Sequence, residues 1–156
     1  MPKLDLTSAP FVSFAADDPL GAARRWAVGD AGGLTQFGVA IEELSAGAAS
    51  SERHWHSDED ELVYVLDGAI TLVEDDGATS LKPGDAVAWP ANRPNAHRLE
   101  NHSTSTVRFL VVGKRSATDT VNYPDLGQTR VRAADGSWQL TGPGGTLIEE
   151  GGHANA

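Results

Sequence analysis

Two histidines and a glutamate that follows them form the part of the sequence best suited to chemistry. His54 and His56 are separated by one residue, Glu61 follows after four more, and the glycines Gly47 and Gly68 frame the stretch. Side chains alternate between the two faces of a strand, so both imidazoles would point the same way and could bind a single metal ion. Glu61 would open the next strand, and the sheet must fold so that its carboxylate meets the two histidines.

A third histidine stands in a second stretch, which runs from Gly84 to Asn101. Pro90 begins a proline-rich turn, and His97 follows that turn. His97 and Asn101 would share one face of a strand. Three neutral imidazoles and one carboxylate would leave two positions open on a metal ion. Nitrogen and oxygen ligands of this kind suit iron, manganese, nickel, zinc, cobalt or copper, and the ligand types exclude none of them.

The composition limits the remaining chemistry. The chain has 156 residues, no cysteine and a formal net charge of -10. The lack of cysteine excludes a disulfide framework, a thiolate nucleophile and cysteine-ligated zinc or iron–sulfur centres. An acidic chain is not expected to bind nucleic acid, nor to dock on an anionic membrane through a basic patch. The sequence shows neither the apolar segment of a signal peptide nor an apolar run of membrane-spanning length, so we expect a cytoplasmic protein.

Short apolar runs separated by glycine and proline predict a protein made mostly of strands. The chain contains 17 Gly and 8 Pro, and a short stretch at 17–24 is the only plausible helix. Many short strands at close spacing are typical of a sandwich or barrel. The last residues, 149–156, have too little apolar content to pack, and we expect them to fray. We expect a loop at 29–33, strands at 25–28, 36–44, 53–56, 62–66, 69–73, 79–81, 86–89, 97–100 and 106–112, and a hairpin between 129–132 and 137–140.

The two chemically rich stretches resemble the two signature motifs of the cupin superfamily. In the first, the glycines, the histidine pair and Glu61 follow the family spacing, with one extra residue before His54. In the second, Asn92 stands where the family usually has glycine, and two extra residues precede His97. Asparagine tolerates left-handed backbone conformations nearly as glycine does, so we expect the turn to survive.

The resemblance implies an all-β fold, the antiparallel double-stranded β-helix, or jelly-roll barrel, in which cupins are built. On this basis residues 1–34 would form a short N-terminal extension, 35–115 the barrel core, and 116–156 a C-terminal extension with a small hairpin. The stretches 61–68 and 121–125 look like those of single-domain bacterial cupins of the sugar-phosphate isomerase-like group. Fold and motif do not by themselves fix a reaction.

The same resemblance assigns the metal ligands and an oligomeric state. It implies one divalent transition metal (Fe, Mn, Ni or Zn) near the centre of the barrel, with His54, His56, Glu61 and His97 as its ligands. The neighbouring Glu59 shares the strand parity of Glu61, but only Glu61 has the offset from the closing glycine that the motif requires. Cupins commonly dimerise through an outer sheet face, so the resemblance also implies a homodimer.

Three arginines that flank the motifs are candidate substrate-binding residues. Arg53, Arg93 and Arg98 could each pair with a substrate carboxylate or phosphate, although an arginine at such a place is more often an ordinary surface residue. Between positions 52 and 67 the chain carries six acidic residues against one base. This local charge should recruit a metal cation, and it should repel an anionic substrate unless the metal and an arginine offset it. A neutral or metal-chelating molecule is therefore also a candidate substrate.

A metal held in this way could polarise a carbonyl or hydroxyl group, lower the pKa of a bound water, or bind substrate and dioxygen together. The first role leads to our main expectation, a metal-dependent, isomerase- or epimerase-like enzyme acting on a small oxygenated molecule. The alternatives are an iron-dependent dioxygenase and a non-catalytic module that binds a small ligand. The sequence does not identify a catalytic base. The expected partners are a small molecule and a second copy of the chain, and neither nucleic acid nor a membrane.

Overall fold

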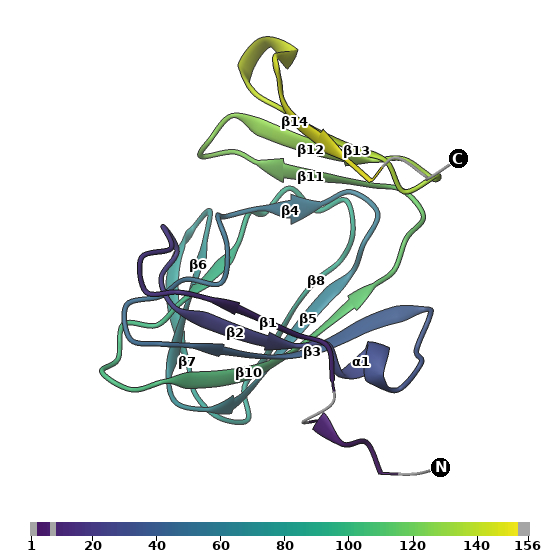
Figure 1. Ribbon diagram of the computed structural model, residues 1–156. Coiled ribbons are helices and arrows are strands. Elements are labelled where there is room, and N and C mark those ends of the chain that lie inside the picture. Colours follow the sequence, from purple (N-terminus) through teal and green to yellow (C-terminus); the bar gives the residue numbers. More distant parts are fainter. Residues whose placement is uncertain (1–2, 7–8, 153–156) are drawn as a thin grey trace.

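Antiparallel strands make up most of the molecule, which confirms the predicted all-β class. The computed structural model describes residues 3–6 and 9–152. Within these residues the strands form three sheets of six, five and three strands (Figure 1). The six-stranded and three-stranded sheets form the jelly-roll barrel, and the five-stranded sheet lies across one end of it.

The barrel is built from the two sheets that contribute the hydrophobic core. The larger one has the order β1-β2-β3-β10-β5-β8, and the smaller one has the order β7-β6-β9. The larger sheet contains β1 (Phe11–Phe14), β2 (Ala23–Trp26), β3 (Phe37–Leu44), β10 (Val107–Lys114), β5 (Glu61–Asp67) and β8 (Ala86–Trp89). The smaller sheet contains β6 (Ile70–Glu74), β7 (Gly77–Leu81) and β9 (Arg98–Glu100).

The third sheet joins the C-terminal residues to the strand of the histidine pair. Its order is β14-β13-β12-β11-β4, so the chain end is tied to the first motif through β11. In this pairing Val121 lies opposite His56. The sheet contains β4 (Trp55–His56), β11 (Asp119–Tyr123), β12 (Gln128–Arg132), β13 (Trp138–Thr141) and β14 (Leu147–Gly151). Figure 1 shows β11 to β14 as a separate layer above the barrel.

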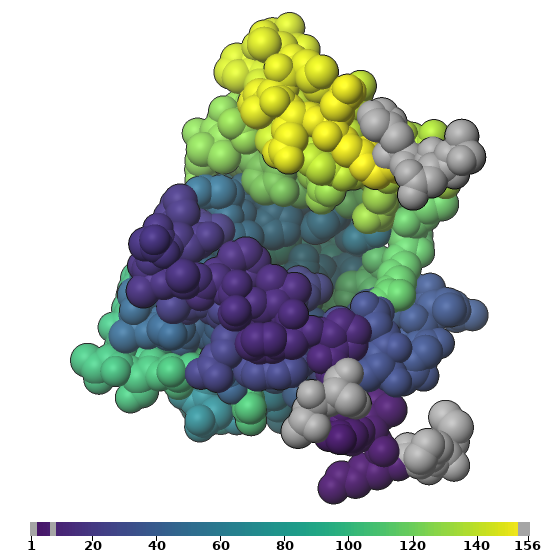
Figure 2. All heavy atoms as spheres, in the orientation of Figure 1, coloured from purple at the N-terminus to yellow at the C-terminus, as the bar shows by residue number. Residues whose placement is uncertain are grey.

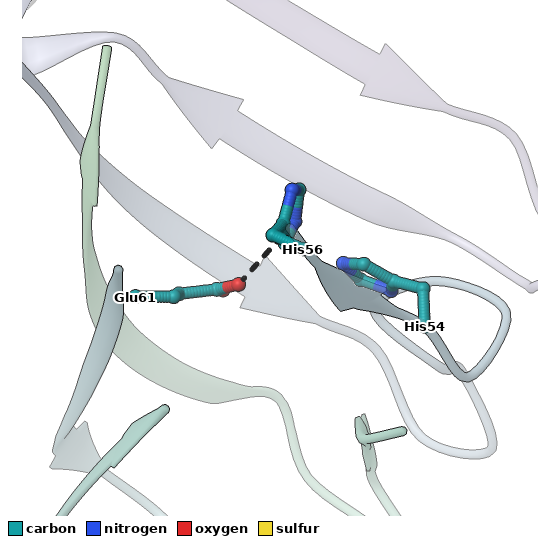
Figure 3. A group of neighbouring side chains, drawn as sticks. All are labelled: His54, His56 and Glu61. Atoms are coloured by element: carbon teal, nitrogen blue, oxygen red, sulfur yellow. Dashed lines mark ion pairs between the residues drawn. The ribbon is translucent and has the colours of Figure 1, made fainter. Parts of the chain in front are cut away.

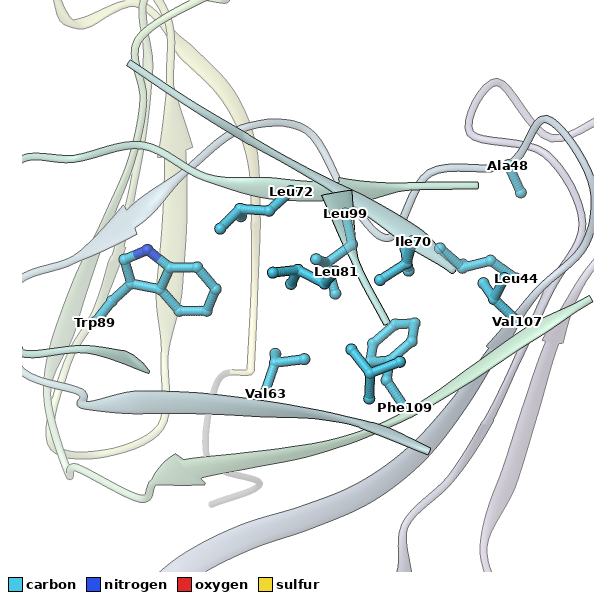
Figure 4. Close-up of a cluster of buried hydrophobic side chains, with 11 residues drawn as sticks. Leu44, Ala48, Val63, Ile70, Leu72, Leu81, Trp89, Leu99, Val107 and Phe109 are labelled. Atoms are coloured by element: carbon cyan, nitrogen blue, oxygen red, sulfur yellow. The ribbon is translucent and has the colours of Figure 1, made fainter. Parts of the chain in front are cut away.

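The strand pattern of β5 shows how the core is formed. Val63 and Val65 point inward and are buried, whereas Leu62 and Tyr64, which alternate with them, are about 40% exposed. Phe109 on the neighbouring strand β10 is completely buried. The buried cluster also draws on both sheets, as Figure 4 shows, through Leu44, Ala48, Ile70, Leu72, Leu81, Trp89, Leu99 and Val107. It therefore fills the barrel from one end up to Trp89, which borders the candidate site.

The prediction of a helix at 17–24 is wrong, because the structure has turns and the start of β2 there. Asp18 accepts a hydrogen bond from the backbone N–H of Leu20 at 2.9 Å, and such a local bond favours a turn over a helix. Gly21 then takes a left-handed conformation at φ 84°, and residues from Ala23 onward form β2. A short helix, α1 (Val28–Ala31), lies where a strand end and a loop were predicted, and a 3-10 turn, η2, spans Pro143–Gly145.

The C-terminal part is more ordered than predicted. Residues 149–151 were expected to fray, but they belong to β14 and pair with β13. The pairing supplies backbone hydrogen bonds that compensate for the low apolar content. Residues 153–156, including His153, lie outside the described residues. In the part of the chain that is described, no helix is both long and apolar enough to cross a membrane, and the cytoplasmic location stays a prediction.

Candidate metal centre

Backbone pairing between the two motifs brings the three histidines together. His54 and His97 exchange both of their backbone hydrogen bonds, at 3.1 and 3.0 Å. The N–H of Asn92 donates to the carbonyl of His56 at 2.9 Å, which fixes the turn that precedes His97. Asn92 has a φ of 59°, so the expectation that asparagine can take the left-handed place of glycine is confirmed. The turn thus folds back and sets His97 beside the histidine pair.

Glu61 faces the histidines from the opposite wall. It begins β5 on the inward face that it shares with Val63, and its Oε2 lies 3.4 Å from Nε2 of His97 and 3.8 Å from Nε2 of His56. Ligand atoms of His54, His56 and Glu61 lie within 4.8 Å of one another. Figure 3 shows the side chains of these three residues pointing toward one common position. The structure therefore brings these three predicted ligands together and places the fourth, His97, beside Glu61.

Each of the three histidines uses its Nδ1 atom to contact an oxygen that only accepts hydrogen bonds. The acceptors are the carbonyl of Glu52 at 2.9 Å for His54, Asp119 Oδ2 at 2.6 Å for His56, and the carbonyl of Asn95 at 3.2 Å for His97. Such partners require a hydrogen on Nδ1, so we assign a lone pair to Nε2 of each imidazole in its neutral form. Those lone pairs and the carboxylate of Glu61 are all electron-rich. A cation is the group that satisfies them together.

The donor set fits a divalent transition metal. Three imidazole nitrogens and one carboxylate oxygen are the ligands that iron, manganese, nickel and zinc accept in proteins. Ligating histidines usually direct their second ring nitrogen to a carbonyl or carboxylate, and all three histidines do so here. His54, His56, Glu61 and His97 would hold the ion, which agrees with the sequence-based assignment.

The electrostatics of the site favour a neutral His54 and an ionised Glu61, the protonation states that a metal requires of these two residues. Burial lowers the pKa of His54, so its imidazole is neutral at neutral pH. Burial alone would raise the pKa of Glu61, but the three histidines in their protonated form lower it overall, His97 through a hydrogen bond and its charge and the other two through their charge. Burial also lowers the pKa of His56, yet the hydrogen bond and charge of Asp119 outweigh this effect and raise it. The raised pKa of His56 shows how strongly the Asp119 carboxylate acts on this histidine.

An aromatic ring and a half-buried glutamate hold His97 in place. The ring of Trp89 stacks on the His97 imidazole with centroids 3.7 Å apart and an interplanar angle of 9°. Nε1 of Trp89 and the side-chain amide of Asn95 both donate to Glu74 Oε1 at 2.8 Å. His97 itself is only 4% exposed. The two extra residues of the turn are accommodated without moving the imidazole away from Glu61.

The candidate metal ligands line a cavity of about 680 Å³. Gly113 lies opposite Glu61 in the sheet, and Gly38 lies opposite Gly113. Two neighbouring glycines leave space where side chains would otherwise fill the barrel. Tyr123 and Arg132 line the cavity from the C-terminal sheet, and Figure 2 shows a hollow between that sheet and the N-terminal strands. The cavity can admit a small molecule next to the ligand set.

The three predicted substrate-binding arginines occupy different environments. Arg98 lines the cavity, and its guanidinium Nε donates to Glu100 at 2.6 Å. Arg53 is not among the lining residues, because its guanidinium is bound to Asp125 at 2.6 Å and to Asp75 at 2.9 Å. Arg93 is exposed and also lies away from the lining.

Distant strands contribute bases that the local sequence did not reveal. The described lining holds five basic and four acidic side chains, and the additional bases are Arg25, Lys114, Arg115 and Arg132. Arg132 pairs with Glu59, which removes one carboxylate of the acidic stretch from the local field. Lys114 Nζ donates to a backbone carbonyl at 3.1 Å. The cavity is therefore much less negative than residues 52–67 alone predicted, because β2, β10 and β12 bring compensating charge.

Sequence reasoning missed two titratable residues of the cavity. Glu42 occupies an inward position of β3 between the buried Ala40 and Leu44, and pairs with Arg25 at 2.9 Å. Burial raises its pKa, as does the charge of Glu61, while Arg25 partly offsets both. A glutamate at an inward position of the predicted strand 36–44 was the signal that could have revealed it. The other is Tyr123, whose ring centroid lies 5.8 Å from that of His54 and whose pKa is raised by burial.

Comparison with known proteins identifies the family. A cupin domain model matches residues 40–113. A crystal structure from Silicibacter pomeroyi, described as a sugar phosphate isomerase from a cupin superfamily, is 38% identical with a TM-score of 0.85, and the match covers 95% of this chain and 97% of that one. The chain belongs to the cupin superfamily. The match to this solved cupin extends well past residue 113, so it includes most of the C-terminal sheet.

Two further relatives carry names from two different classes of enzyme. A cupin structure from Acidithiobacillus ferrooxidans, named provisionally as a sugar phosphate isomerase, is 30% identical with a TM-score of 0.80, covering 90% of each chain. Quercetin 2,3-dioxygenase of Bacillus subtilis is 38% identical over 60 residues, which are 38% of this cupin but 18% of the dioxygenase. The match to the dioxygenase thus spans less than a fifth of that enzyme.

Proposed function

We propose that this cupin is a metal-dependent isomerase or epimerase of a small hydroxylated carbonyl compound, with sugar phosphates as the leading substrate class. The observation that carries the proposal is that three histidines and Glu61 lie close together in the lining of a cavity of about 680 Å³. The names of the two similar cupin structures support the reaction class.

The chemistry of such a reaction divides between the ion and the cavity residues. A divalent metal, when bound, would supply a Lewis acid that polarises the substrate oxygen. Isomerisation then needs a group that takes a proton from the carbon next to the carbonyl and returns it to the neighbouring carbon. Glu42 is suited to this task, because it lines the cavity, lies outside the ligand set, and has a pKa raised by burial. Tyr123 keeps its proton and can donate a hydrogen bond to a substrate oxygen.

An anionic group on the substrate is supported by the bases of the cavity. Arg98 and Lys114 both line it. Among the described residues, Lys114 has no carboxylate partner within ion-pair distance. Guanidinium and ammonium groups are the usual protein ligands of phosphate and carboxylate. Of the three arginines that flank the motifs, we therefore propose Arg98 as the substrate-binding one.

The test is an exchange experiment that does not require the true substrate to be known in advance. The protein is loaded separately with Fe²⁺, Mn²⁺, Ni²⁺ or Zn²⁺ and incubated in D₂O with a panel of aldose and ketose phosphates. NMR then follows the carbon next to the carbonyl. We expect deuterium incorporation with at least one metal, and a loss of about 100-fold or more in Glu42→Gln, which keeps the metal. Absence of exchange with every metal and every sugar phosphate would contradict the proposal.

A dioxygenase is the second candidate, favoured by the match to quercetin 2,3-dioxygenase. Oxygen consumption by the Fe²⁺-loaded protein with quercetin distinguishes the two reactions, because isomerisation consumes no oxygen. A protein that binds both metal and sugar phosphate, but catalyses neither reaction, would be the non-catalytic binding module.

A further inference from the structure

The carboxylate of Asp119 reaches the candidate metal centre from outside the cupin motifs. Asp119 begins β11 in the C-terminal sheet and is only 2% exposed. Its Oδ2 contacts Nδ1 of His56 at 2.6 Å, and its Oδ1 accepts the backbone N–H of Asp58 at 3.1 Å. Both oxygens are thus engaged. The matched cupin domain ends at residue 113, before this strand begins.

The contact sets His56 apart from the other two histidines. The Nδ1 atoms of His54 and His97 contact backbone carbonyls, whereas that of His56 contacts a carboxylate. An ionised carboxylate can only accept, so the hydrogen of a neutral His56 must reside on Nδ1. The lone pair of Nε2 then faces Glu61. A carboxylate partner also makes the imidazole a stronger donor to a metal ion.

Asp119 is better placed to orient His56 than to bind an ion itself. Carboxylate oxygens of Asp119 and Glu59 do lie close to an imidazole nitrogen of His56, as metal ligands would. Glu59, however, is engaged by the guanidinium of Arg132 and by the backbone N–H of Ser116 at 3.1 Å. The guanidinium of Arg132 therefore already provides the positive charge beside Glu59 and Asp119. The Nε2 atom of His56 points the other way, toward Glu61.

We propose that Asp119 is a positioning residue of the metal centre, which holds His56 in the Nδ1–H tautomer and thereby makes the C-terminal sheet part of the metal site. This inference rests on the proposed metal-dependent function. It assigns a role to the extension that the two cupin motifs do not contain. Arg132 on Glu59 and Asp125 on Arg53 attach the same sheet to the barrel on either side of His56.

The decisive variant is Asp119→Asn, which keeps the shape of the side chain. The amide oxygen can still accept the N–H of Asp58, which leaves the NH₂ group facing Nδ1 of His56. An NH₂ group donates, so the hydrogen of the imidazole must move to Nε2. The same replacement beside a catalytic histidine is known to select the wrong tautomer in a serine protease. Nε2 would then carry a hydrogen where a metal ion needs a lone pair.

Two measurements test this role without any substrate. Nitrogen-15 NMR of the imidazoles in the metal-free protein, at a pH where they are neutral, reports which ring nitrogen carries the hydrogen. We expect Nδ1–H for His56 in the wild type and Nε2–H in Asp119→Asn. Zn²⁺ affinity, measured by competition with a chromophoric chelator, should fall by about 10–100-fold in the variant. Asp119→Glu, which restores a carboxylate, should regain the Nδ1–H tautomer.

Asp125→Asn is the matched control. It removes a carboxylate of the same sheet that binds Arg53 and contacts none of the three histidines. Its Zn²⁺ affinity and its His56 tautomer should equal those of the wild type. An unchanged tautomer or an unchanged affinity in Asp119→Asn would overturn the inference. If the wild type itself binds no Zn²⁺, the proposed function fails, whereas the tautomer measurement still decides whether Asp119 orients His56.

Discussion

At the scale of single residues, Glu42 is the side chain whose position is hardest to explain by packing. It lies on the inward face of β3, where its neighbours on that face are Ala40 and Leu44. The charged groups that act on it are Arg25 from β2 and Glu61 from β5, and the residue opposite it on β10 is the buried Phe109. Burial of a carboxylate at such a place destabilises its charged form. A group that reduces stability in this way is expected at a functional position.

Replacement of Glu42 by glutamine should make the folded protein more stable at neutral pH. The pKa of Glu42 in the folded protein is raised above the ordinary value of 4.5, chiefly by burial. The wild type therefore loses stability as pH rises from the ordinary value through the raised one, because the unfolded chain releases this proton first. The Glu42→Gln variant has no carboxyl group at this position, so it does not lose this stability as the pH rises. Its advantage in free energy of unfolding, measured by urea denaturation, should grow as the pH rises above 4.5 and should disappear below that pH.

Glu43→Gln provides the control on the opposite face of the same strand. Glu43 binds Arg24 at 3.5 Å and Arg108 at 2.9 Å on the outside of the sheet. This variant should gain no stability at neutral pH. A Glu42→Gln protein that is less stable than the wild type at pH 8 would show that the ion pair with Arg25 outweighs the burial of the carboxylate.

At the scale of elements, the turns that join the strands determine where the ligands lie. Gly68 closes the first motif at the end of β5 with a φ of 76°. A Cβ atom at this position would lie 2.7 Å from Cγ1 of Val107, a buried residue of β10. Gly47, which opens the motif, has a similar φ of 79° but no neighbouring atom within 4 Å of such a Cβ. The two glycines are therefore required for different reasons.

The two alanine variants should separate these reasons. Gly47→Ala should lower the free energy of unfolding by about 1–2 kcal/mol, which is the cost of a side chain in the left-handed conformation. Gly68→Ala should lose about 1–3 kcal/mol more, because its methyl group also collides with Val107. Urea denaturation measures both. If both variants lost the same free energy of unfolding, β10 would have to move away from the new methyl group without any loss of stability.

The sequence predicts most strands of the barrel because their alternating faces and turns are local features. The predicted elements are wrong where a local sequence pattern competes with pairing to a distant strand. The run 17–24 has the composition of a short helix, yet Asp18 and Gly21 form turns and Ala23 begins β2. The polar residues of β14 gave no strand signal, because that strand depends on its pairing with β13.

The candidate site likewise contains some residues that the sequence predicts and others that it does not. The spacing of the motifs predicts that the histidines and Glu61 lie together, and the structure places them near one another, because their distances along the chain are set by two strands and one turn. Asp119, Glu42 and Arg132 come from other strands, and only the registry of the sheets places them beside the ligands. The charge of the cavity was misjudged for this reason, since a window of sequence contains only its local charges.

At the scale of the whole molecule, an apolar row crosses the outer face of the six-stranded sheet. Residues opposite one another in successive strands share a face, and on this face they are Phe11, Trp26, Ile41, Leu110, Tyr64 and Ala86. Phe11 is 50% and Tyr64 40% exposed. An exposed apolar row on the outer face of a sheet can pack against the same row of a second copy related by a two-fold axis. We propose that the homodimer predicted from the sequence forms through this face.

The dimer is tested by sedimentation equilibrium. The wild type should sediment as a dimer, and Tyr64→Lys should sediment as a monomer, because it places a charge at an exposed position of the row. Val131→Lys is the control, since Val131 is 47% exposed on β12, in a different sheet. It should leave the dimer intact. A monomeric wild type at micromolar concentration would contradict the proposed interface.

The account depends above all on the metal centre, and the metal content of the purified protein tests it most directly. Elemental analysis of protein purified without added metal should give about one transition metal per chain for the wild type. The same content is expected for His102→Ala, because that histidine is exposed and contacts only Glu100 among the residues described. The double variant His54→Ala/His56→Ala should contain none while it keeps the fold. Full metal occupancy in the double variant would contradict the account.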